Sequence, residues 1–187
     1  MWVPPGHFGG RRRFFSRPMT PSLESELAFL SILQAARLLR RKEISPVDLV
    51  NAALSRIERL NPSLNAFLTV LADRARKQAR AAERQFVRAN RGNETGPNSP
   101  LFGIPISLKD NFWTQGIRTT AGSKMLANFV PKQDSDVAAR LTGTGAILLG
   151  KTNMHEFAYG ITNDNPHYGA VHNPWALSRI PGGSSGG

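Results

Sequence analysis

The sequence predicts an α/β fold in which several helices precede a unit of strand, helix and strand. In the first half of the chain, apolar residues recur at the three- and four-residue spacing of helices. After Pro100, short apolar runs and Gly-rich loops take over, with one further helix between them. With 187 residues, of which 40% are apolar, the chain is long enough to bury a core.

The composition excludes several classes of function. The chain contains no cysteine, which removes disulfides, thiolate nucleophiles and cysteine-ligated zinc. No apolar run reaches the roughly 18 residues that a membrane-spanning helix needs. The net charge of +11 suggests nucleic-acid binding, but the basic residues are concentrated in residues 1–20 and 71–91 instead of forming one continuous stripe.

Residues 1–20 differ from the rest of the chain because they are rich in arginine and contain no acidic residue. Transit peptides share this composition, but Pro4, Pro5 and Gly9-Gly10 oppose the amphipathic helix of such a leader. We therefore expect a disordered segment or an over-extended start, with Met19 as the alternative first residue. The expected location is the cytoplasm, or an organelle matrix if these residues target one, and residues 21–187 form the predicted domain.

Helices dominate the next part of the chain. The first is indicated by apolar residues at helical spacing: Phe29, Leu33, Ala36 and Leu39. A second begins with Ser45 as N-cap, Pro46 at the first helical position and Asp48 completing a capping box, and Asn61-Pro62 should end it.

A third helix is predicted over residues 72–90. One face is a stripe of small or apolar residues suited to close packing: Ala72, Ala75, Ala79, Ala82, Phe86 and Ala89. Another face carries four basic residues: Lys77, Arg80, Arg84 and Arg88. We interpret them as a solvated face, with phosphate binding as the alternative. Residues 91–100 have the composition of a surface loop.

The second half of the chain contains two predicted strands with a helix between them. Residues 104–108 form an apolar run that places Lys109 at its end. Residues 134–136 offer caps for a helix, which Gly143-Thr144-Gly145 ends before a second strand at 146–149. This succession is typical of an α/β fold.

Two motifs in this half are weak. Residues 145–152 match the phosphate-loop pattern G-x-x-x-x-G-K-[ST], but the intervening Ala, Ile, Leu and Leu predict a strand where a flexible loop is required. The four histidines lack metal-ligand spacing, so we interpret them as loop or packing residues: His7, His155, His167 and His172.

Three blocks together resemble the amidase signature family. They are GIPISLKDNFWTQGIRTTAGS at 103–123, GAILLGKTNMHEFAYGITNDNPHYGAVHNPW at 145–175 and IPGGSSGG at 180–187. Residues 44–67 also resemble the N-terminal helices of that family, so the resemblance covers nearly everything from residue 27 onward. It implies the N-terminal portion of an α/β/α fold around a mixed sheet, preceded by helices.

The resemblance also implies a catalytic triad of serine, cis-serine and lysine. Lys109 corresponds to the lysine, Ser184 to the cis-serine, and Ser185 to a neighbour that supports their hydrogen bonds. The nucleophilic serine would belong to a later block beyond Gly187, so we expect the chain alone to be inactive. The loop glycines that would approach substrate are Gly182, Gly183 and Gly186. No metal and no organic cofactor is implied.

The chemistry of such a site is demanding. A serine hydroxyl becomes a nucleophile only when a base takes its proton, and lysine is a base only when neutral. Since the reference pKa is about 10.4, work near neutral pH needs a drop of roughly three units, about 4 kcal/mol. Burial at a strand end could provide this. The alternatives are a solvated lysine beside Asp110 and a flexible Gly/Ser linker around Ser184.

Three functions remain open at this stage. The first is hydrolysis of a small-molecule amide. The second is the A subunit of a glutamine-dependent amidotransferase for misacylated tRNA, which would have partner subunits. Those proteins usually read Met-Asp-Glu-Phe where this chain has Met154-His155-Glu156-Phe157, which favours the hydrolase. The third is a basic nucleic-acid-binding module. No membrane partner is expected.

Overall fold

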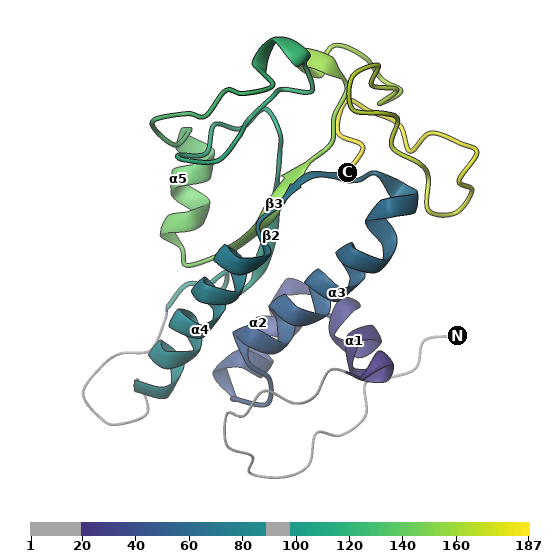
Figure 1. The fold of residues 1–187 in the computed structure, drawn as a ribbon. Coiled ribbons are helices and arrows are strands. Elements are labelled where there is room, and N and C mark those ends of the chain that lie inside the picture. The colour runs from purple at the N-terminus through teal and green to yellow at the C-terminus, as the bar shows by residue number, and fades with distance from the viewer. Residues whose placement is uncertain (1–19, 89–97) are drawn as a thin grey trace.

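Helices cover both faces of a small mixed sheet, and long loops gather beyond one end of its strands (Figure 1). The fold is known from a computed structural model, which describes residues 20–88 and 98–187. In this part of the chain the sheet has three strands in the order β1-β3-β2: β1 (Phe67–Val70), β2 (Pro105–Lys109) and β3 (Ile147–Thr152). β3 runs parallel to β2 and antiparallel to β1, which confirms the predicted α/β class. Of the proposed leader at residues 1–20, all but Thr20 lie outside the described residues.

The helices follow the order of the chain. They are α1 (Pro21–Ala28), α2 (Ile32–Arg40), α3 (Pro46–Leu64), α4 (Ala72–Arg88) and α5 (Asp136–Gly143), with short 3-10 turns η2 (Lys124–Leu126) and η3 (Glu156–Ala158). Within the described residues, none of these helices is both long enough and apolar enough to cross a bilayer.

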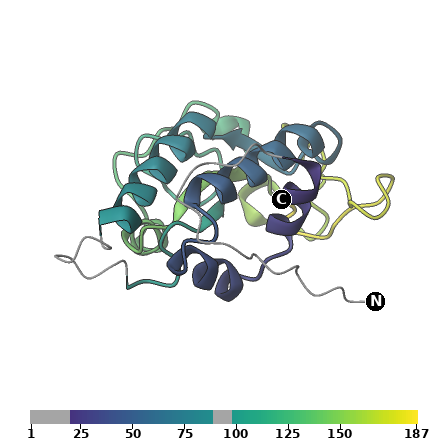
Figure 2. The same ribbon diagram turned by 90° about the horizontal axis from the view of Figure 1, so that it is seen from below.

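Side chains that alternate along β3 divide the core into two layers. Ile147 and Leu149 pack in a cluster with residues of α3 and α4, whereas Leu148 packs with Leu108 and with Ala138 of α5. The sheet therefore lies between α3 and α4 on one face and α5 on the other. In Figures 1 and 2 the C-terminal loops, in yellow, lie on the side away from the end of α4.

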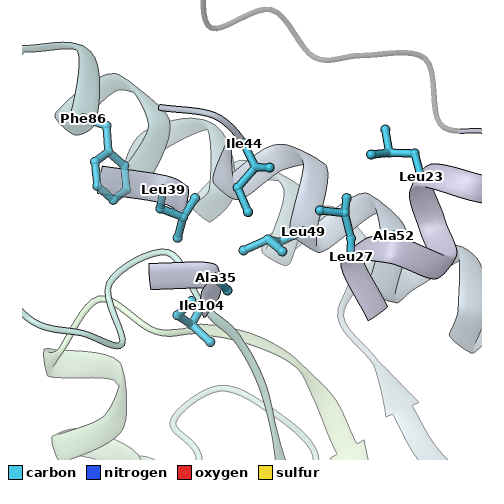
Figure 3. Close-up of a cluster of buried hydrophobic side chains, with 9 residues drawn as sticks. All are labelled: Leu23, Leu27, Ala35, Leu39, Ile44, Leu49, Ala52, Phe86 and Ile104. Carbon is cyan, nitrogen blue, oxygen red and sulfur yellow. The ribbon is translucent and has the colours of Figure 1, made fainter. Parts of the chain in front are cut away.

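A third cluster joins the N-terminal helices to the rest of the fold. Figure 3 shows its nine buried side chains, which come from α1, α2, α3, α4 and the segments beside α3 and β2. Leu39 is fully buried in it, and the rings of Phe86 and Phe102 meet edge to face with centroids 5.4 Å apart. This packing holds the helices against the sheet.

The prediction of one continuous helix through Phe29 and Leu33 was wrong. The chain breaks between α1 and α2, where Ser31 begins α2 with a capping box. Phe29 and Leu33 are 78% and 61% exposed, and the buried face of α2 is formed by Ala35, Ala36 and Leu39. The local cap therefore outweighs the apparent periodicity.

The start of α3 is confirmed, but its predicted end at Asn61-Pro62 was wrong. Ser45 and Asp48 form the capping box, with N–H···O distances of 3.1 and 2.9 Å. Pro62 lies inside the last turn, and the helix continues to Leu64 until Asn65 adopts the left-handed conformation at φ 53°. β1, which follows directly, was not predicted.

The third predicted helix is confirmed as α4 up to its last described residue, Arg88. Its small-residue stripe is buried through Ala75, Ala79, Ala82 and Phe86. The basic side chains on its other face are exposed to solvent: Lys77, Arg80, Arg84 and Arg88. This arrangement agrees with a solvated face.

Most of the apparent phosphate loop, residues 147–152, is β3. Gly150, Lys151 and Thr152 are strand residues and are buried, so their backbone N–H groups do not form a phosphate cradle. Gly150 is required by close approach, because a Cβ there would lie 2.2 Å from the carbonyl oxygen of Thr69 on β1. The strand, and not a nucleotide, explains this glycine.

Gly150→Ala is expected to lower the free energy of unfolding by about 1–3 kcal/mol, because the added methyl forces β1 and β3 apart. The measurement is the thermal melting temperature of the purified protein. Gly143→Ala is the matched control, since no atom of the described residues beyond its own helix backbone and chain neighbours lies within 4 Å of a Cβ at that position. Equal melting temperatures for the two variants would contradict the prediction.

Candidate active site

Lys109 and Ser184 are 75 residues apart in the chain and meet at the end of β2. The Lys109 Nζ atom donates a hydrogen bond to Ser184 Oγ at 2.6 Å. Lys109 is partly buried, and burial lowers its pKa below the ordinary value for lysine. The peptide bond between Gly183 and Ser184 is cis. The lysine therefore contacts the loop and does not extend freely into solvent.

The Gly-Ser loop binds along the segment that follows β3. The carbonyl oxygen of Ser184 accepts a hydrogen bond from the His155 amide at 2.9 Å. Ser185 forms an antiparallel bridge with Met154, and the Gly186 and Gly187 amides donate to the Asn153 carbonyl at 3.4 and 3.3 Å. These backbone contacts hold the loop against the residues that follow β3, so it is not a free linker.

The predicted site glycines have different surroundings. Gly186 leaves room for a neighbour, because a Cβ there would lie 1.6 Å from Asn163 Nδ2. Gly183 lies against the backbone of Ile161, and Gly182 has φ +95°. The Ser185 side chain is exposed, and its hydroxyl makes no hydrogen bond within the described residues.

Buried asparagines support this segment. Asn153 Nδ2 donates to the carbonyls of Asn65 and Gly169, both at 3.1 Å. Asn165 Nδ2 donates to the carbonyls of Gly122 and Met154 at 2.8 and 2.9 Å. Because their side chains replace backbone pairing, irregular loops can be held in a buried position. These asparagines were not among the predicted site residues, although Asn153 closely follows an apolar strand.

A second lysine, Lys151, is buried next to the end of β2, where it pairs with the residue that follows Lys109. Lys151, on β3, and Asp110, after β2, are 0% and 1% exposed, with Lys151 Nζ 3.5 Å from Asp110 Oδ1. Burial lowers the pKa of Lys151, and the carboxylate of Asp110 partly offsets this effect. In the sequence, Lys151 is noticeable only within the phosphate-loop pattern, and its pairing with Asp110 was not predicted.

The histidines in the described part of the chain belong to loop contacts. His167 Nε2 lies 3.0 Å from Glu156 Oε1, and His172 Nδ1 lies 2.7 Å from the Leu177 carbonyl. Hydrogen bonding from Ser123, followed by His167, lowers the pKa of Glu156. No group of three or more potential metal ligands occurs in residues 20–88 and 98–187. His7 lies outside the described residues.

Sequence comparison gives the family. The family model described as Amidase matches residues 48–187. This chain belongs to the amidase signature family. It is 50% identical over 158 residues to the A subunit of glutamyl-tRNA(Gln) amidotransferase from Pseudomonas aeruginosa, covering 84% of this chain and 31% of that protein. The corresponding protein of Aromatoleum aromaticum is 51% identical over 160 residues, covering 86% and 31%. The chain thus spans about a third of the length of these relatives.

Solved amidases of this family share the fold. The peptide amidase of Stenotrophomonas maltophilia superposes with a TM-score of 0.75 at 34% identity, over 85% of this chain and 33% of that protein. A bacterial aryl acylamidase gives a TM-score of 0.76 at 30% identity, over 84% and 32%. The mixed sheet and its flanking helices are therefore those of the amidase signature fold.

Proposed function

We propose that this chain supplies the lysine and the cis-serine of a serine-dependent amide hydrolase. Lys109 acts as the general base and Ser184 as the proton relay. The observation that carries the proposal is the 2.6 Å hydrogen bond between Lys109 Nζ and Ser184 Oγ, together with the lowered pKa of Lys109. A lysine that loses its proton more readily than usual is suited to accept one from a hydroxyl.

The reaction follows from this arrangement. Neutral Lys109 accepts the proton of the Ser184 hydroxyl, and Ser184 Oγ takes the proton of the nucleophilic serine. The activated oxygen attacks the amide carbonyl carbon and forms a tetrahedral intermediate. The proton returns along the same path to the leaving nitrogen, so that ammonia or an amine departs and an ester remains. Water then attacks the ester carbonyl while Ser184 and Lys109 accept its proton, and that proton passes to the serine oxygen as the ester bond breaks and the acid leaves.

The nucleophilic serine of the proposal is contributed from outside residues 1–187. We therefore expect residues 1–187, expressed alone, to release no ammonia or amine from any amide. The measurement is product release by the purified segment beside the full-length protein that carries it. Equal turnover by the segment would contradict this assignment and would require a nucleophile within it.

A second candidate is the glutaminase component of an amidotransferase that acts on glutamyl-tRNA. Identities near 50% to proteins of that name favour it, whereas the two solved amidases described above are 30% and 34% identical. His155, where those proteins usually carry aspartate, favours the hydrolase. Both candidates use the same first chemical step, because glutamine is itself an amide.

The two candidates differ in their dependence on partners. As a hydrolase, the full-length protein should release ammonia or amine from simple amides without any other protein. As part of an amidotransferase, it should release ammonia from glutamine only after the other subunits of the complex are added. The measurement is ammonia release from a panel of amides and from glutamine, with and without those subunits. Inactivity under every condition would contradict both.

A further inference from the structure

The end of β2 directs two neighbouring side chains to opposite sides of the sheet. In the pairing of β2 with β3, Lys109 lies opposite Thr152 and Leu108 lies opposite Lys151. Successive strand residues point to opposite faces, so Lys109 contacts Ser184 while Asp110 turns to the side of Lys151. The residue that follows the proposed base, Asp110, is therefore the acidic member of the ion pair.

This ion pair joins three segments of backbone. Lys151 Nζ donates to the Phe112 carbonyl at 2.7 Å and to Thr119 Oγ1 at 2.8 Å, in addition to its contact with Asp110. Asp110 Oδ2 accepts from the Thr120 amide at 2.8 Å. β3, the end of β2 and the loop at 112–120 are thus fixed to each other. Because both charges are removed from water, each depends on the other for compensation.

We propose that Lys151 and Asp110 are a positioning pair for Lys109. The pair fixes the Lys109 side chain in its direction toward Ser184, and because the two charges cancel, it adds no net charge to the surroundings of Lys109. The inference rests on the proposed function, because it assigns the pair a role in the action of Lys109 as a base. It adds two residues that touch neither substrate nor Ser184 and that act only through Lys109.

Three segments that meet at the end of β2 carry charged groups. Asp110 lies at the end of β2, Lys151 lies on β3, and His155 and Glu156 follow β3, with His167 on Glu156. Asp110 and Lys151 compensate each other, so removal of one leaves an uncompensated buried charge, either on the residue next to Lys109 or on its partner in β3. An unpaired carboxylate favours the Lys109 ammonium, and an unpaired ammonium disfavours it.

The test is the pH dependence of kcat/KM for amide hydrolysis by the full-length protein. The rate should rise with pH as Lys109 loses its proton. Lys151→Met leaves Asp110 unpaired, so the midpoint of this rise in kcat/KM should shift by about one pH unit toward higher pH. Asp110→Asn leaves Lys151 unpaired and still offers an acceptor to Thr120, so the rise should move toward lower pH. The double variant Asp110→Asn with Lys151→Met should return close to the original midpoint.

A merely structural role for the pair would lower activity without opposed shifts of the midpoint. Arg59→Met, which breaks the Arg59–Glu24 pair between α3 and α1, is the matched control and should leave the midpoint unchanged. If Lys151→Met does not fold, Asp110→Asn and the double variant still carry the test. Unshifted midpoints in folded variants would overturn this inference alone. Absence of amide hydrolysis in the unaltered protein would overturn the proposed function as well.

Discussion

Lys109→Met is expected to reduce kcat/KM for amide hydrolysis by about 10²–10⁴-fold, because the site loses the base that takes the proton from Ser184. Methionine keeps most of the length of the side chain and cannot accept a proton from a hydroxyl. The fold should persist, since Lys109 lies at the end of β2 and is only partly buried. The measurement is steady-state kinetics of the full-length protein beside a circular dichroism spectrum of each variant.

Two further lysine variants make this result specific. Lys109→Arg retains a positive charge but holds its proton at all ordinary pH values, so it should be as inactive as Lys109→Met. Lys132→Met removes an exposed lysine and should leave kcat/KM unchanged. Activity in Lys109→Arg within a few-fold of the unaltered protein would show that a neutral amine is not required, and would contradict the assignment of the base.

Ser184→Ala is expected to have the second-largest effect, a loss of about 10²–10³-fold in kcat/KM, since the proton has no hydroxyl through which to reach Lys109. The hydroxyl is the acceptor of the 2.6 Å hydrogen bond from Lys109 Nζ. The backbone contacts of the loop, including His155 N–H to the Ser184 carbonyl, do not depend on that hydroxyl and should persist. The measurement is kcat/KM at several pH values.

Ser185→Ala is the matched control for this variant. Ser185 is next in the chain and equally small, but its side chain is exposed and makes no hydrogen bond within the described residues. Its replacement should therefore cost much less activity than Ser184→Ala. A larger loss in Ser185→Ala would reverse the roles proposed for the two serines.

Much of the fold could be predicted because its signals are local. The Ser45 capping box, the alanine stripe of α4 and the apolar run before Lys109 each depend on a few neighbouring residues. The predictions of helix limits failed where a single residue, and not the apolar spacing or a proline, sets the point at which a helix begins or ends. Ser31 separates α1 from α2, and Asn65 ends α3 beyond Pro62. β1 was missed although Phe67, Thr69 and Val70 favour strands, because it has four residues and its pairing among the described residues is with β3, about 80 residues later.

The site was harder to predict from physical reasoning alone. Lys109 and Ser184 were identified through the family resemblance, because nothing in the spacing of two residues 75 positions apart predicts a hydrogen bond. The partnership of Lys151 with Asp110 was missed for a different reason. It depends on the register irregularity between Ile106 and Ser107 in the β2–β3 pairing, after which Lys151 lies opposite Leu108. Such a register shift is a property of the pairing between two strands about 40 residues apart, so it cannot be read from either strand alone.

The central claim is that Lys109, through Ser184, activates a serine contributed from outside residues 1–187. It is tested most directly by treating the full-length protein and its Lys109→Met variant with a sulfonyl fluoride and locating the adduct by peptide mass spectrometry. We expect one labelled serine outside residues 1–187 in the unaltered protein and little or no label in the variant. A label on a serine within residues 1–187, or equal labelling of both proteins, would contradict the claim.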